Sequence, residues 1–86
     1  MLPYFQIIWD DDDDETGNVQ HIAEHFLLRD EVEFVVQNAS VEEVSHSSGR
    51  PCCFGYTPSG DYIIVIYELV DEDTIYPITA YVVPEP

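Results

Sequence analysis

The sequence predicts a single α+β domain in which a strand and two helices precede three or four further strands. Two observations predict this order: apolar residues recur at helical spacing between positions 19 and 37, and apolar runs separated by short turns fill positions 51 to 83. The economical packing places both helices on one face of an antiparallel sheet. Because 86 residues form one modest core, we expect a single domain over residues 1–86.

The first half of the chain predicts one strand, an acidic loop and two helices. Residues Tyr4–Trp9 are rich in β-branched and aromatic side chains, as in a strand, whereas Asp10–Glu15 is an acidic run that must be a solvated loop. Thr16 or Asn18 can cap the first helix, and Asp30–Gln37 predicts the second. The predicted inward positions of the two helices are Val19, Ile22, Ala23, Phe26, Leu27, Val32, Val35 and Val36.

The second half predicts a meander of strands. The predicted strands are Val41–Ser45, Pro51–Thr57, Tyr62–Leu69 and Thr74–Val83. Residues Tyr62–Leu69 are apolar on both faces, which indicates a covered central strand. Pro77 lies inside the last strand and lacks a ladder donor, so it predicts an edge position or a bulge. The chain ends in Pro84-Glu85-Pro86, so we expect no C-terminal helix.

The charge is strongly unbalanced. Eighteen acidic residues stand against two basic ones, Arg29 and Arg50, and the formal net charge is −16. Because phosphate binding depends on Lys and Arg, this balance disfavours direct nucleic-acid binding and favours a basic protein partner. We find no apolar run of bilayer length and no signal peptide, so the expected location is the cytoplasm, without membrane contact.

The two cysteines, Cys52 and Cys53, are adjacent. Neighbours in a strand point to opposite faces, so one should enter the core and the other should face outward. A disulfide between them would be badly strained, and we interpret both as reduced packing residues. No residue pattern indicates a cofactor.

Several short motifs, in their order and spacing, resemble the BrnT family of bacterial toxins, within the wider RelE-like fold group. The motifs are Trp9-Asp10, Asn18 ahead of His21 and His25, Arg50 followed by Gly55 and Gly60, Val65–Tyr67, and Thr74–Tyr81. The resemblance covers about Ile7 to Tyr81, which is nearly the whole chain. It implies a toxin–antitoxin type fold, a small antitoxin as partner, and a metal-independent ribonuclease activity.

The residues that the resemblance would make catalytic are largely replaced. Tyr76 and Tyr81 stand where the family has two arginines in its last strand, and Glu24 stands where a lysine is usual. Only Arg50 and His25 keep matching positions. Since one lost oxyanion donor costs about 10²–10³ in rate, we expect Tyr76 and Tyr81 to be half-buried strand aromatics in a protein without catalysis.

A metal site has a weak candidate in His21 and His25, which are four residues apart on the predicted helix. Glu24 between them is misplaced for the metalloprotease pattern, and a third ligand would have to come from His46 or the acidic run. We therefore expect neither a metal nor another cofactor.

Two functions of different classes follow from these observations. The first is a non-catalytic interaction module that binds a basic protein, for example an antitoxin-like chain. The alternative is an active metal-independent ribonuclease toxin that uses Arg50 and His25. A homodimer could form through the strand edge of Thr74–Val83 or Tyr4–Trp9, although Pro77 and the charge oppose such pairing.

Overall fold

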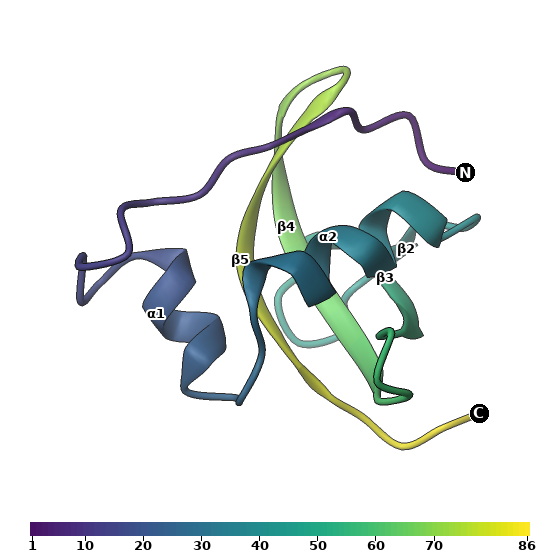
Figure 1. Ribbon diagram of the computed structural model, residues 1–86. Coiled ribbons are helices and arrows are strands. Elements are labelled where there is room, and N and C mark those ends of the chain that lie inside the picture. Colours follow the sequence, from purple (N-terminus) through teal and green to yellow (C-terminus); the bar gives the residue numbers. More distant parts are fainter.

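Two helices and a five-stranded sheet make up the fold seen in the computed structural model, which describes residues 1–86 (Figure 1). The elements in chain order are β1 (Gln6–Ile7), α1 (Asn18–Ala23), α2 (Arg29–Asn38), β2 (Glu43–Val44), β3 (Pro51–Tyr56), β4 (Tyr62–Asp71) and β5 (Thr74–Val82). The α+β class and the order of elements are as predicted. Neither helix has the length and apolar character needed to cross a membrane.

The sheet has the strand order β1-β5-β4-β3-β2, and it is mixed rather than antiparallel. Strands β2 to β5 pair antiparallel, but β1 runs parallel to β5, with Gln6 opposite Thr74 and Ile7 opposite Ile75. The antiparallel prediction was wrong for β1. Parallel neighbours need a crossover, and here the two helices and three strands between β1 and β5 supply it.

The first strand is shorter than the predicted Tyr4–Trp9 because its partner strand cannot continue the ladder. Ile8 donates its N–H to the carbonyl of Ile75 at 3.0 Å. Pro77 has no N–H to offer next, and its carbonyl accepts a hydrogen bond from the side chain of Asn18 at 2.9 Å. The β5 register with β4 also shifts at this point, since Tyr67 pairs with Pro77 while Ile66 pairs with Thr79. The bulge predicted at Pro77 is confirmed.

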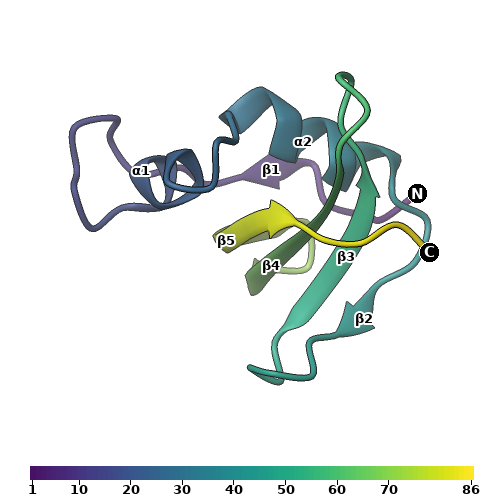
Figure 2. The ribbon, with the colours of Figure 1, turned by 90° about the horizontal axis from the view of Figure 1, so that it is seen from below.

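Both helices bury their apolar sides on the same face of the sheet, as Figure 2 shows. The thirteen core residues on this face are Tyr4, Ile22, Leu27, Val32, Val35, Val36, Ala39, Cys53, Ile63, Val65, Tyr67, Ile75 and Ala80. Val32, Val35 and Val36 are the inward positions predicted for α2. Gly55 lets α2 approach closely, because an added Cβ there would lie 3.1 Å from Cγ1 of Val35.

Helix α1 ends earlier than its apolar spacing predicts. The N–H of Phe26 donates to the carbonyl of Ala23 at 2.9 Å, and that of Leu27 to the carbonyl of Ile22 at 3.1 Å, which is the bond pair of a Schellman cap. Phe26 adopts φ of +64° at the position where glycine is usual, and its side chain is 93% exposed. The prediction that Phe26 and Ala23 face the core was therefore wrong, whereas that for Ile22 and Leu27 is confirmed.

The opposite face of the sheet carries a smaller apolar cluster. Cys52, Ile64 and Ile66 are buried there, with Phe54, Tyr81 and Val83 packed against them. The two cysteines do point to opposite faces, but both are buried and free, so the prediction that one faces solvent was wrong. Burial raises the pKa of both thiols, that of Cys53 to about 12.

Candidate functional site

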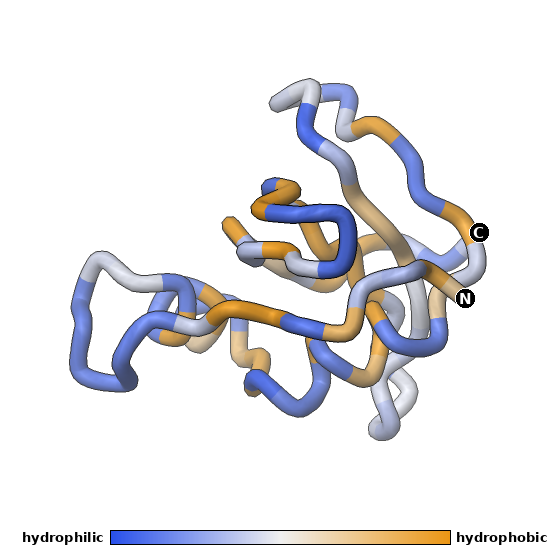
Figure 3. The backbone as a smooth tube through the Cα atoms, turned by 90° about the horizontal axis from the view of Figure 1, so that it is seen from above, coloured by the Kyte–Doolittle hydropathy of each residue, from blue (hydrophilic) through white to orange (hydrophobic).

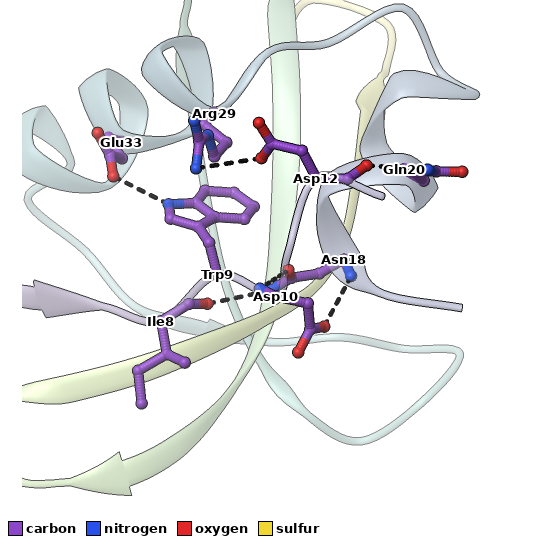
Figure 4. A network of polar contacts seen from close by, with 8 residues as sticks. All are labelled: Ile8, Trp9, Asp10, Asp12, Asn18, Gln20, Arg29 and Glu33. Atoms are coloured by element: carbon purple, nitrogen blue, oxygen red, sulfur yellow. Dashed lines mark hydrogen bonds and ion pairs between the residues drawn. The ribbon is translucent and has the colours of Figure 1, made fainter. Parts of the chain in front are cut away.

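The acidic loop, residues Asp10–Glu15, is closed at its base by two residues that bond to each other. Asp10 donates its N–H to Oδ1 of Asn18, and the N–H of Asn18 donates to Oδ2 of Asp10, both at 2.9 Å (Figure 4). The Asp10 carboxylate thus caps α1, a role predicted for Thr16 or Asn18. Gly17 permits this contact, because an added Cβ would lie 2.6 Å from Cβ of Asp10.

Asn18 also joins the loop to the sheet. Its side-chain amide donates to the carbonyl of Ile8 at 3.0 Å and to that of Pro77 at 2.9 Å. The side chain is 3% exposed, so every polar atom of the amide is used inside the protein. The hydroxyl of Tyr76 donates to the same carboxylate oxygen of Asp10 that accepts from Asn18. The loop base is therefore fixed to both α1 and β5.

Three further contacts brace the loop from outside this base (Figure 4). Trp9 donates its indole N–H to Glu33 at 2.9 Å, and Arg29, one turn earlier on α2, lies 3.4 Å from a carboxylate oxygen of Asp12. Gln20 of α1 donates to the carbonyl of Asp12 at 2.8 Å. Helix α2 and helix α1 therefore both hold the segment that leads into and through the loop.

Of the four remaining carboxylates in the loop, Asp14 accepts two hydrogen bonds from Thr16 and the other three are unpaired. The side chains of Asp11, Asp13 and Glu15 are exposed and make no hydrogen bond or ion pair within the chain. Figure 3 shows the segment as a continuous hydrophilic loop that projects from one end of the molecule. The loop therefore presents carboxylates from a fixed base, rather than as the purely solvated run that the sequence predicts.

Four of the five residues singled out as candidate site residues gather at α1 and β5. The ring of His25 lies against Tyr81, with centroids 5.6 Å apart, and against His21 at 5.7 Å. A cleft of about 240 Å³ lies beside Tyr76 and His21. Tyr76 and Tyr81 are only partly exposed, as predicted for strand aromatics, whereas His25 lies beyond the end of α1.

Arg50 lies just ahead of β3 and is already paired. Its Nε and Nη2 both lie 3.2 Å from Oε1 of Glu68, and the pair is about half exposed. Glu68 is opposite Tyr76 in the β4–β5 ladder, so the ion pair sits beside the tyrosine on the sheet. With Arg29 bound to Asp12, both arginines of the chain are engaged by carboxylates.

No group of three or more His, Cys, Asp and Glu side chains is close enough together to hold a metal ion. The His21 and His25 rings contact each other edge to face at 65°, without a third donor. The arrangement around β5 thus offers two imidazoles, two phenols and the carboxylates of Asp10 and Glu68, and no free cation for a developing negative charge.

Alkaline pH is expected to unfold the protein through tyrosines that donate to carboxylates. The pKa of Tyr76 is raised to about 12, chiefly by its hydrogen bond to Asp10, and that of Tyr4 to about 12, chiefly by burial. Burial is also the main cause that raises the pKa of Tyr67. A group with a raised folded pKa stabilises the fold fully below its unfolded value, here about 10, and loses that contribution as pH rises through the folded value.

We therefore expect the free energy of unfolding to fall between about pH 10 and pH 12. Circular dichroism and tyrosinate absorbance, followed together, would measure this loss. The tyrosines that are hydrogen-bonded to carboxylates should ionise in the same pH step in which the circular dichroism signal of the folded protein is lost. If all tyrosines ionised while the circular dichroism stayed native, the assignment of these hydroxyls would be wrong.

The sequence did not predict two features of this region: the reciprocal hydrogen bonds between Asp10 and Asn18, and the exposure of Phe26. A signal for the first was present, because an Asp and an Asn flank a polar loop just ahead of a helix. No pattern signals the second, since Phe26 fits the apolar spacing of α1.

Comparison with protein-family models, with curated proteins and with solved structures finds no match to this chain. The resemblance to the BrnT family therefore stays a prediction from the motifs alone.

Proposed function

We propose that this protein is a non-catalytic interaction module that binds a basic protein partner. The observation that carries the proposal is the braced acidic loop, whose Asp11, Asp13 and Glu15 carboxylates are unpaired while both arginines are bound by other acids. A cationic partner would meet carboxylates on a fixed base, so it need not order a flexible chain on binding.

The overall field supports the same class of partner. A net charge of −16 on a protein of 86 residues attracts cationic proteins and accelerates their association. The same field repels RNA, DNA and a second copy of the chain. The proposed location is the cytoplasm, because a reducing compartment keeps thiols such as the two buried, free cysteines reduced. If the BrnT-like ancestry holds, the partner is an antitoxin-like chain.

The partner should be sought by co-purification from the native cell and by testing the protein encoded by the neighbouring gene. Binding should weaken steeply as ionic strength rises, because the Debye screening length falls from about 30 Å at 0.01 M to about 10 Å at 0.1 M. The variant Asp11→Asn/Asp13→Asn should lower the association rate constant about 3- to 10-fold. Isothermal calorimetry and stopped-flow fluorescence measure the two effects.

A matched control removes the same charge elsewhere. Asp61→Asn/Glu72→Gln neutralises two exposed carboxylates on the turns at the two ends of β4, where neither side chain makes a hydrogen bond or an ion pair. It should change the association rate constant less than the loop variant does. The proposal is abandoned if the protein forms no complex with any basic protein at low salt.

The ribonuclease alternative draws on one observation, the contact of His25 with Tyr81 beside Tyr76 on β5. It would require Arg50 to leave Glu68 and approach a phosphate. Expression in a bacterial host, with growth and RNA integrity followed, separates the two functions. RNA cleavage that Arg50→Ala abolishes would replace our proposal with the alternative.

A further inference from the structure

A cleft of about 290 Å³ lies where α1, the turn after it and the start of α2 meet the acidic loop. Its lining residues are Asp12, Val19, Ala23, Leu27, Leu28, Arg29 and Asp30. Four of these are apolar. Charged side chains surround them, and the only cation among these, Arg29, is bound to Asp12. The cleft therefore combines an apolar lining with a net negative rim.

The turn beside this cleft exposes large apolar side chains. Phe26 is 93% exposed and Leu28 is 67% exposed, and between them Leu27 turns into the core. Phe26 also holds a left-handed conformation, φ +64°, in which a side chain other than that of Gly or Asn is strained. Glycine would fit this cap better, so the phenylalanine weakens the fold locally. Strain of this kind concentrates at sites that bind.

We propose that this cleft and Phe26 form the docking site for an amphipathic, cationic segment of the partner protein. Apolar side chains of that segment would enter the cleft and pack against Phe26, while its Lys and Arg side chains face Asp12, Asp30 and the acidic loop. The inference rests on the function proposed above and adds to it the place and chemistry of the contact.

Charge argues for this occupant over two others. A second copy would bring its own net charge of −16 against the same acidic rim. A bilayer with anionic lipids would be repelled in the same way. A segment with cations beside apolar anchors satisfies both parts of the site.

The test uses two synthetic peptides of equal length and charge with the full-length protein. One is a helix-forming Lys/Leu peptide with all leucines on one face, and the other has each leucine replaced by glutamine. The first should bind at least about 10-fold more tightly, a ratio that charge alone does not give. Fluorescence anisotropy at fixed ionic strength measures both affinities.

Phe26→Gly should weaken binding of the Lys/Leu peptide about 10-fold while the melting temperature stays the same or rises, because the strain is relieved. Phe5→Ala is the matched control: Phe5 is 82% exposed, but it lines a different cleft beside Gln37, at the other end of α2. This control should bind within twofold of the unmodified protein.

The outcomes separate the docking site from the proposed function. Equal binding of the two peptides, or unchanged affinity in Phe26→Gly, would overturn the docking site and leave a purely electrostatic partner interaction standing. If neither peptide binds at low salt, the docking site falls, whereas the proposed function falls only if no basic protein binds at low salt either.

Discussion

Replacing Asn18 with alanine is expected to lower the free energy of unfolding by about 2–4 kcal/mol. The side chain makes three hydrogen bonds, to the N–H of Asp10 and to the carbonyls of Ile8 and Pro77. Each contributes about 1 kcal/mol, and the loss also leaves the carbonyl of Pro77 without this partner inside the protein. Urea unfolding followed by circular dichroism measures the change.

Asn38→Ala is the control for this substitution. Asn38 is exposed at the end of α2 and makes one side-chain hydrogen bond, to the carbonyl of Phe34 at 2.8 Å. Its replacement should cost no more than about 0.5–1 kcal/mol. Equal losses in the two variants would mean that Asn18 does not join the loop, α1 and β5 as described.

Replacing Glu42 with alanine is expected to lower the free energy of unfolding by about 2–3 kcal/mol. One carboxylate oxygen of Glu42 accepts from the hydroxyl of Tyr4 at 2.5 Å and from that of Tyr67 at 2.6 Å. Tyr67 is fully buried in the core, and the two rings contact edge to face at 5.6 Å. Removing the acceptor leaves two phenol groups without a partner, and thermal and urea unfolding would report the loss.

The neighbouring acid and a double variant test this assignment. Glu43 is exposed and its side chain makes no hydrogen bond, so Glu43→Ala should change stability by less than about 0.5 kcal/mol. Tyr67→Phe should cost less in the Glu42→Ala background than in the native protein, because its hydroxyl has already lost its acceptor. Additive losses would contradict the shared carboxylate.

The parts of the fold that follow from local pattern were predictable. The spacing of Val32, Val35 and Val36 locates α2 to within a residue at each end, and the apolar run around Val65 locates the central strand. Pro77 signalled the bulge because a missing N–H acts on any ladder in the same way. Each of these features is set by residues that are close together in the sequence, so the local residue pattern is enough to predict it.

The parts that depend on distant contacts were not predictable. Phe26 continues the apolar spacing of α1, yet the helix ends before it, with Phe26 in a left-handed conformation and Leu27 buried in the core. The parallel pairing of β1 depends on where the chain returns after the helices, and Asp10 caps α1 from eight residues away. The order of apolar and polar residues does not show which distant segments come into contact in the fold.

Of the candidate site, the residue types were predictable and their pairing was not. The sequence offered Arg50 many carboxylates, but it did not show that Glu68 would be its partner. It placed His21 and His25 on one helix, whereas the second histidine lies beyond the helix and contacts Tyr81.

The reciprocal bonds between Asp10 and Asn18 join the two ends of the acidic loop, and of positions 11 to 16 only Asp12 bonds to the helices. Changes at the exposed and unpaired positions Asp11, Asp13 and Glu15 therefore need not reach the core. These three positions can thus vary in sequence while the scaffold stays constant.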